Sequence, residues 1–379
     1  MKIVIAPDSF KESLTAQQVC EAVKEGLIRV WPHADLHAVP VADGGEGTAQ
    51  ALLDATGGTW QTVEVTGPLG NQVTAKYAQL GDGKTAAIEM AEACGLHLVP
   101  RDQRDPERTT SYGMGELVKH ALDHGFRHLI IGLGGSATND GGCGMLMALG
   151  AKCYQADGHE IELGGAGLAA LSRLDVSGLD TRLFDCDIDV ACDVDNPLCG
   201  PRGASAIFGP QKGANEQQVT KLDKALHHFG QLVEKVTGRK VIDVKGAGAA
   251  GGMGAAWLGL TSANLKPGVE IVLQTTALAS QLSQAQLVIT GEGRIDGQTV
   301  FGKTPIGVAK LAKAQGIAVI AIAGCVGDGY QAVYQHGIDA VFTCLPKVMP
   351  LSEALEQAHD NIANVAENIA RSLQLNLVK

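Results

Sequence analysis

Aromatic side chains are scarce in this 379-residue chain, at 4% of the total, whereas glycine occurs 49 times. There is no excess of positive charge either: 41 acidic residues outnumber 30 lysines and arginines, and the formal net charge is -11. An acidic balance argues against nucleic acid or an anionic membrane surface as a partner. Many glycines with few aromatics are typical of an α/β enzyme with tight loops, rather than of an all-β binding module.

Paired cysteines and long apolar runs are also lacking. The nine cysteines form no CxxC pair and no regular spacing, which predicts reduced thiols in a cytoplasmic protein. The apolar run at residues 3–6 is too short for a signal peptide. No stretch approaches the roughly 20 apolar residues of a membrane span. The length predicts two domains, each able to bury a core.

The amino-terminal segment alternates short apolar strands with helices. Residues 3–6 read as a buried strand, and Thr15 as the N-cap of a helix that continues to about Val30. A second strand at 36–40 leads into acidic residues and glycines at 41–48, and a helix follows at 49–55. This order predicts a parallel sheet with polar loops along one edge.

The middle of the chain changes pattern. Alternating runs at 61–65, 73–80 and 84–90, separated by glycine-rich turns, predict antiparallel strands. We interpret this change as the entry to an inserted domain, predicted over 61–284.

The alternation of strands and helices resumes near residue 285. Strands are predicted at 287–290, 317–323 and 338–343, with helices at 306–315 and 352–373. The first and last segments, 1–60 and 285–379, should therefore share one sheet and form a discontinuous domain.

Charged residues cluster directly after the predicted strand 287–290. Glu292, Arg294 and Asp296 follow it among glycines that let a ligand approach the backbone. Ligands of open α/β sheets bind at this end of the strands. Residues 297–304 also match a P-loop formally, but the match does not leave its strand directly, and Pro305 disfavours a helical Thr304. The better interpretations are a turn whose amides and Lys303 contact phosphate, or a plain connection with a proline at the helix start.

Two other strand ends carry candidate groups. The predicted strand 129–133 runs into the glycine-rich turn 134–142, where Ser136 and Thr138 add hydroxyls to an anion-binding design. The strand 188–192 leads to Asp193 and Asp195, which can hold Mg²⁺ or accept a proton. A tight glycine turn and an Asx-turn are the respective alternatives.

Two further patterns are weak. His120 and His124 are four residues apart on a predicted helix, but no third metal ligand is evident, so a solvated helix end is the better interpretation. Residues 246–251 spell GxGxxG, yet a lone match without a surrounding mononucleotide-binding half is poor evidence for a dinucleotide site.

Five separated motifs together resemble the bacterial glycerate kinase family of the glycerate 2-kinase kind, in the same order over essentially the whole chain. They are the segments 6–14, 42–47, 134–138, 193–198 and 291–296. The resemblance implies ATP-dependent phosphorylation of D-glycerate with Mg²⁺, with 2-phosphoglycerate favoured over 3-phosphoglycerate. It also implies an α/β fold of two domains, one discontinuous and Rossmann- or flavodoxin-like and one mixed, with the active site in the cleft.

The expected roles follow from what phosphoryl transfer needs, which is positioning and charge stabilisation. Asp193 or Asp43 would orient or deprotonate the glycerate hydroxyl, and Lys11 and Arg294 would bind the glycerate carboxylate or the transferring phosphoryl. The remaining candidates for contacts with substrate or phosphate are Asp8, Ser9, Gly44, Gly45, Gly134, Gly135, Ser136, Thr138 and Lys303, and the candidates for Mg²⁺ are Asp195, Glu292 and Asp296.

Two hypotheses from other classes remain open at this point. A nicotinamide-dependent hydroxy-acid oxidoreductase would be built on Gly246–Gly251, although no ribose-binding acid follows a first-strand glycine turn. A sensor would bind glycerate or nucleotide without turnover, but carboxylates concentrated at strand ends are hard to justify for a sensor.

Overall fold

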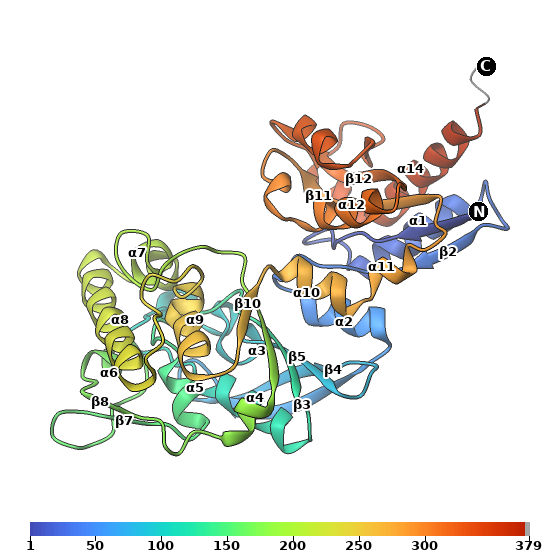
Figure 1. The fold of residues 1–379 in the computed structure, drawn as a ribbon. Helices are drawn as coiled ribbons and strands as arrows, with labels where there is room; N and C mark the ends of the chain where they lie inside the picture. The colour runs from blue at the N-terminus through green and yellow to red at the C-terminus, as the bar shows by residue number, and fades with distance from the viewer. Residues whose placement is uncertain (376–379) are drawn as a thin grey trace. The chain divides into compact units, whose positions relative to one another are not determined.

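The computed structural model describes residues 1–375, which form two compact units (Figure 1). Unit 1 contains residues 1–43 and 50–57 together with the chain from 269 on, and unit 2 contains residues 44–49 and 58–268. Within the described part of the chain, no helix combines the length and apolar character needed to cross a membrane.

Unit 1 is built on a five-stranded parallel sheet of order β13-β12-β11-β1-β2. This confirms that the first and last segments of the chain share one sheet. The chain leaves β1 toward β2 on one side, whereas β11 joins β1 on the other, so the topological switch point lies between β1 and β11. The strands are β1 Lys2–Ile5, β2 Asp35–Ala38, β11 Leu287–Ile295, β12 Ala318–Val326 and β13 Ala340–Thr343.

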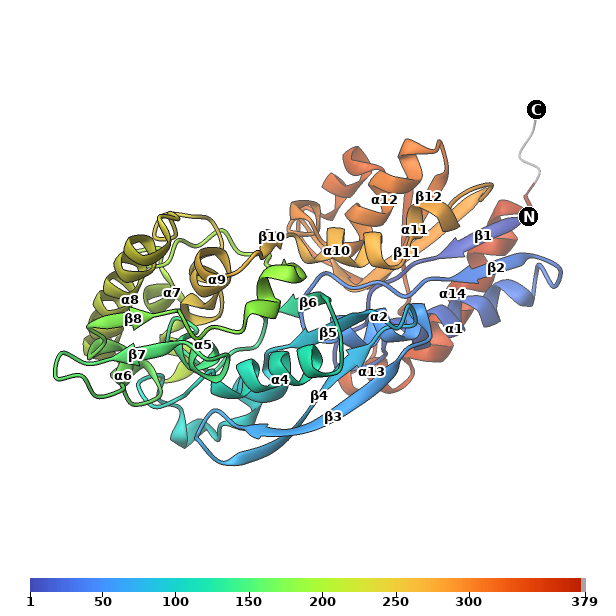
Figure 2. The same cartoon turned by 60° about the horizontal axis from the view of Figure 1, so that its bottom comes forward.

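Helices cover both faces of this sheet. Figure 2 shows α1 and α14 on one side and α10, α11 and α12 on the other. The first pair closes a core with Ile3, Ile289 and Ile322, which project from one face of three neighbouring strands. The helices of unit 1 are α1 Ala16–Ile28, α2 Thr48–Thr56, α10 Gly268–Thr275, α11 Leu278–Gln281, α12 Thr304–Ala314, α13 Leu351–Glu356 and α14 Ala358–Leu373.

Helix α1 starts where its sequence predicts. The Thr15 side chain accepts a hydrogen bond from Gln18 N, and the Gln18 side chain accepts one from Thr15 N, which completes a capping box. Further along, Gly26 allows close approach to α14, because a Cβ there would lie 2.0 Å from the Ala363 carbonyl oxygen.

Three local predictions for unit 1 are wrong in their boundaries. Strand β11 does not end at Thr290 but continues to Ile295, because β12 pairs with it along its whole length, up to Ile295 opposite Val326. Helix α12 begins at Thr304, so Pro305 occupies its first turn and does not displace Thr304 from the helix. The last predicted helix is two helices, α13 and α14, separated by Gln357.

Unit 2 contains a six-stranded sheet of order β10-β9-β6-β5-β4-β3. The pairs β3–β4 and β4–β5 are antiparallel, as predicted, whereas β5, β6, β9 and β10 pair in parallel. The inserted segment therefore forms a mixed sheet. Its strands are β3 Thr59–Thr66, β4 Gln72–Gln79, β5 Thr85–Glu89, β6 His128–Gly132, β9 Asp187–Ala191 and β10 Asn264–Lys266.

Helices pack on this sheet around a large apolar core that includes Phe229 and Trp257, and a small hairpin completes the unit. The helices are α3 Ala91–Cys94, α4 Tyr112–Asp123, α5 Cys143–Ala148, α6 Gly165–Ala169, α7 Ala204–Phe208, α8 Glu216–Thr237 and α9 Ala249–Leu260, and the hairpin strands are β7 Lys152–Tyr154 and β8 Arg173–Asp175.

The GxGxxG segment lacks the context of a dinucleotide fingerprint. Residues 241–244 form no strand, and Ala250 and Gly251 adopt left-handed backbone angles inside α9. A dinucleotide fingerprint needs a strand that turns directly into a helix. The segment is instead a close-packed entry to α9, since a Cβ on Gly251 would lie 2.0 Å from the Thr138 carbonyl oxygen.

Candidate active site

A cavity of about 360 Å³ lies in unit 1 at the carboxyl ends of β1 and β11. This is the switch point of the sheet, where ligands of open α/β folds bind. Most of the predicted site residues of unit 1 line it. They are Asp8, Ser9, Lys11, Asp43, Glu292, Arg294 and Lys303.

Asp8 stands at the centre of this group and is only 8% exposed. Its backbone N donates to Gly291 O at 2.8 Å, which extends the pairing of β1 with β11 beyond the strand end. Its Oδ1 accepts from Ser9 N at 2.6 Å, and its Oδ2 accepts from Thr304 Oγ1 at 2.6 Å. Burial and the charge of Asp43 raise the pKa of Asp8 to about 6, although the hydrogen bonds from Thr304 and Ser9 oppose the shift.

Glu292 lies on β11 and faces inward, since it is only 9% exposed. Its Oε1 accepts from Thr299 Oγ1 at 2.7 Å, and its Oε2 lies 3.3 Å from Lys303 Nζ. Burial raises the pKa of Glu292, and the charge of Asp8 adds to the rise against the bonds from Thr299 and Lys303. The Asp8 carboxylate therefore acts on Glu292 from the adjacent strand end.

The cations of the cavity are placed differently. Arg294 is largely exposed, and its Nε lies 3.1 Å from Asp296 Oδ2, so Asp296 orients Arg294. Lys303 is the N-cap of α12 and half-buried, and Lys11 is exposed. Three cations beside a helix start can receive an anionic ligand, while the buried carboxylates hold two of the neighbouring hydroxyls in fixed orientations.

Unit 2 gathers a second set of predicted residues. A Cβ on Gly134 would lie 3.8 Å from Gly45 Cα, and a Cβ on Gly44 would lie 3.0 Å from Asp193 Oδ2. Asp193 is exposed, and its Oδ1 accepts from Gly268 N at 3.0 Å. The glycines thus keep the backbone of two loops open beside the Asp193 carboxylate.

Glu89, at the end of β5, was not among the predicted site residues. Its Oε1 accepts from Ala49 N at 2.8 Å, so it caps the start of α2 and fixes the loop that carries Gly44 and Gly45. Burial raises its pKa.

Asp195 belongs to unit 2, whereas the other two magnesium candidates, Glu292 and Asp296, belong to unit 1. It is exposed and paired with Arg202 at 2.9 Å on the surface of unit 2.

The turn 134–138 presents only some of its predicted ligands. Gly134 and Gly135 are exposed and Ser136 is 8% exposed, but Thr138 is fully buried, so its hydroxyl does not reach the surface of unit 2. The helix that follows, α5, is one and a half turns long and contributes little dipole to an anion. The accessible part of the turn is therefore its backbone at Gly134 and Gly135, with Ser136 buried beside it.

Lys212 supports this turn from beneath and was not among the predicted site residues. Its Nζ donates to Ser136 Oγ at 2.8 Å and to Thr138 O at 2.7 Å, and the side chain is 2% exposed. Burial lowers the pKa of Lys212 to about 7, against the opposing influence of Asp140. No local signal marks this residue, because its burial depends on residues more than seventy positions away.

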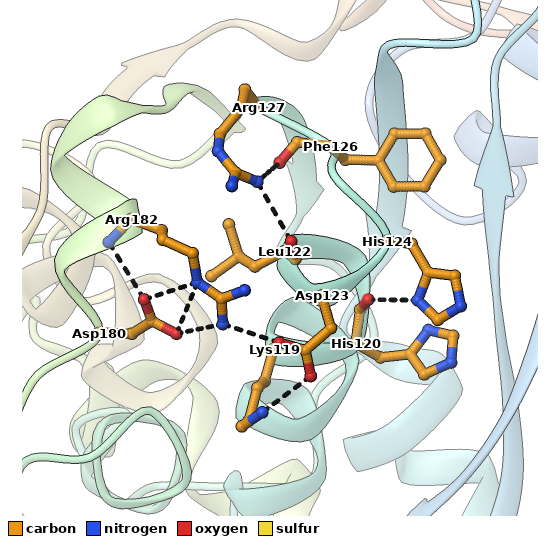
Figure 3. Close-up of polar contacts among 9 residues, drawn as sticks. All are labelled: Lys119, His120, Leu122, Asp123, His124, Phe126, Arg127, Asp180 and Arg182. Atoms are coloured by element: carbon orange, nitrogen blue, oxygen red, sulfur yellow. Dashed lines mark hydrogen bonds and ion pairs between the residues drawn. The ribbon is translucent and has the colours of Figure 1, made fainter.

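His120 and His124 end α4 and stack with ring centroids 4.0 Å apart (Figure 3). His124 Nδ1 bonds to His120 O at 2.8 Å, and His120 Nδ1 lies 3.1 Å from the Tyr77 hydroxyl. Around them, Asp123 pairs with Lys119 and Arg182 at 2.8 Å each. These contacts describe a hydrogen-bonded helix end.

A ready-made metal cage is not part of the described residues. Over residues 1–375, no group of three or more histidines, cysteines, aspartates or glutamates is placed to hold an ion. Magnesium differs from zinc in this respect, because it commonly takes one or two protein carboxylates and completes its shell with phosphate oxygens and water.

Comparison with known proteins fits this arrangement. The sequence pattern of the glycerate kinase family matches residues 3–374. The chain belongs to the glycerate kinase family. It is 55% identical to a glycerate kinase of Haemophilus influenzae over 98% of this chain and 99% of that protein. It is 54% identical to the glycerate 2-kinase of Escherichia coli K12, over 100% of this chain and 99% of that one.

A solved structure shares the fold. A crystal structure described as glycerate kinase 2 of Salmonella typhimurium LT2 superposes with a TM-score of 0.92 at 52% identity, covering 99% of this chain and 98% of that one. Membership of this kinase family makes the protein a phosphotransferase and implies ATP as a substrate. The oxidoreductase hypothesis is thereby set aside, in agreement with the geometry of the GxGxxG segment.

Proposed function

We propose that this protein transfers the γ-phosphoryl group of ATP to the 2-hydroxyl of D-glycerate and yields 2-phosphoglycerate. The observation that supports it most is the cavity at the switch point of unit 1, where cations and buried carboxylates converge. The 54% identity to a protein named glycerate 2-kinase favours the 2-position over the 3-position. All nine cysteines, which lie within residues 1–375, are free, in keeping with a cytoplasmic site of action.

The residues act through charge and position, since phosphoryl transfer needs little covalent help from the protein. Lys11, Arg294 and Lys303 neutralise the glycerate carboxylate and the transferring phosphoryl group. Asp193 orients the substrate hydroxyl and accepts its proton, and Asp43 is the alternative base. The exposed backbone amides of Gly134 and Gly135 bind phosphate oxygens.

Among the carboxylates of unit 1, Asp8 and Glu292 are the better candidates to hold magnesium. Asp43 raises the pKa of Asp8, and Asp8 raises the pKa of Glu292, so a divalent cation beside these carboxylates would relieve the repulsion. Asp296 and Asp195 are weaker candidates, because each is already paired with an arginine. When bound with ATP, the ion would neutralise charge on the phosphates.

The test is ADP release from ATP in the presence of magnesium and D-glycerate, with L-glycerate, glycolate, lactate and tartronate in parallel. Phosphorus NMR of the product identifies the phosphorylated position. We expect a signal that depends on D-glycerate and a single product, 2-phosphoglycerate. ATP binding without turnover of any acid would contradict the proposed reaction, and 3-phosphoglycerate as the product would contradict the position.

A further inference from the structure

The cavity in unit 1 has two chemically different halves. The half near β1 and β11 carries the charged residues described above. The other half, at the carboxyl ends of β12 and β13, is lined by Leu345, Leu351 and Leu355, with Cys344 and Ala358 at its base. A wholly polar acid such as glycerate has no apolar surface to place against leucines, so the second half is built for something else.

Exposure of the leucines points the same way. Leu351 is 70% exposed and Leu345 is 41% exposed, although both border a concave site. Large apolar side chains at the edge of a cavity gain free energy when a ligand covers them. The cavity volume of about 360 Å³ lies in the range of pockets that hold nucleotide-sized or drug-sized ligands, roughly 300–1,000 Å³, and is larger than glycerate needs.

The two halves are joined by one loop. Ser13 Oγ donates to Leu355 O at 2.8 Å, so the loop that begins at Asp8 and carries Lys11 is tied to helix α13. The apolar wall and the cations are thus held together in unit 1. Their order along the cavity suits a ligand in which a flat apolar group is attached to an anionic chain.

We propose that this apolar half is the subsite for the adenine nucleoside of ATP, with the triphosphate extending toward Lys11, Arg294 and Lys303. This proposal rests on the proposed use of ATP and adds where the nucleoside lies. Adenine supplies a planar face for Leu345, Leu351 and Leu355, and the phosphates supply the charge that the cations complement.

The test introduces a carboxylate into the wall with Leu351→Glu. Because Leu351 is largely exposed, the change should leave the fold intact. Leu373→Glu is the matched control, since Leu373 is 53% exposed on α14 and does not line the cavity. Leu345→Ser is a second variant that removes apolar surface without adding charge. The readouts are KM for ATP, KM for D-glycerate, and ADP affinity by calorimetry.

We expect Leu351→Glu to raise KM for ATP and Kd for ADP by roughly tenfold or more, because a charged group cannot cover an apolar base. KM for D-glycerate should change less than about twofold, and Leu373→Glu should match the wild type in all three readouts. Leu345→Ser should shift the nucleotide values in the same direction, by a smaller factor.

A comparison of two phosphoryl donors, with and without a nucleoside, isolates the contribution of the adenine ring. Wild-type protein should prefer ATP to inorganic tripolyphosphate, and Leu351→Glu should lose most of that preference.

For Leu351→Glu, a rise in KM for glycerate with unchanged ADP affinity would overturn the proposed subsite. If the wild type bound ADP but phosphorylated no glycerate, the proposed function would fail, and loss of ADP binding in Leu351→Glu would still support the subsite. Absence of ADP binding to the wild type would overturn it.

Discussion

Asp193 carries its carboxylate on the surface of unit 2 with one oxygen bonded to Gly268 N. A carboxylate has about four lone-pair sites, so Asp193 can hold Gly268 N and also accept a proton from a substrate hydroxyl. Positioned bases typically contribute a factor of about 100 or more to a rate. The structure therefore makes this residue the sharpest test of the proposed chemistry.

We expect Asp193→Asn to lower kcat at least about 100-fold, because the amide keeps the bond to Gly268 but cannot accept the proton. ADP release gives kcat, and near-ultraviolet circular dichroism reports the fold. Asp157→Asn, in an exposed turn of the hairpin, serves as the control and should match the wild type. Near-normal turnover in a folded Asp193→Asn protein would transfer the role of base to Asp43.

Lys212 shows how burial can lower the pKa of a lysine. Its pKa of about 7 lies below that of a lysine in the unfolded chain, about 10.4. Between these values the unfolded chain binds more protons than the folded one, so this residue makes stability rise with pH. Below pH 7 it is charged in both states, and the folded state bears the full cost of the buried charge.

We expect the free energy of unfolding of the wild type, measured relative to that of Lys212→Met, to rise from pH 7 to pH 9. The slope should be roughly 1 kcal/mol per pH unit. Urea unfolding at several pH values measures the difference. Lys224→Met, on the exposed side of α8, should show no such slope. A flat difference for Lys212→Met would mean that the buried ammonium stays charged throughout, stabilised by Asp140.

At the scale of elements, the packing of α1 against α14 depends on one missing side chain. A Cβ added to Gly26 would lie 2.0 Å from the Ala363 carbonyl oxygen, which is closer than real Cβ contacts allow. The neighbouring atom is backbone inside a helix, so it cannot rotate away. The two helices would have to separate over the core that they share.

Gly26→Ala should consequently lower the free energy of unfolding by about 1–3 kcal/mol, even though alanine has the higher helix propensity. Calorimetric unfolding measures the loss. Glu21→Ala, exposed on the same helix, is the control and should change stability by less than about 0.5 kcal/mol. A stabilised Gly26→Ala protein would show that propensity outweighs the close approach.

At the scale of the whole molecule, the two units differ in how the chain builds them. All six strands of the unit 2 sheet come from the continuous segment 58–268. In unit 1, β1 and β2 come from the start of the chain and their partner β11 from beyond residue 286. Only unit 2 can complete its sheet from one continuous stretch of sequence.

A fragment of residues 58–268 should therefore fold by itself and unfold cooperatively on heating, because its sheet and apolar core are complete. A fragment of residues 1–57 should stay unfolded, since two short strands and two helices do not bury a core. Circular dichroism and thermal unfolding of both fragments test this. An unfolded 58–268 fragment would show that the middle segment depends on the rest of the chain.

The sequence alone determined the features that depend on a local pattern of residues, such as the positions of strands and of helix starts. Short apolar or alternating runs predicted every strand of the two large sheets except β10, although they missed the hairpin of β7 and β8. Thr15 predicted the start of α1, and the return of the strand–helix alternation after residue 285 predicted the shared parallel sheet. Polar residues after these runs located Asp8, Lys11 and Lys303, because the carboxyl ends of parallel strands meet at one edge.

Only the tertiary structure decided features that depend on distant partners. Strand β11 continues past Thr290 because β12 pairs with it, and Lys212 is buried because residues 136–138 fold over it. The apolar wall of the cavity has no sequence signature, since Leu345, Leu351 and Leu355 look like ordinary helix and loop leucines until the strand ends bring them beside the cations. Strand pairing, burial of polar groups and concavity are properties of contacts between separated segments, so no local pattern encodes them.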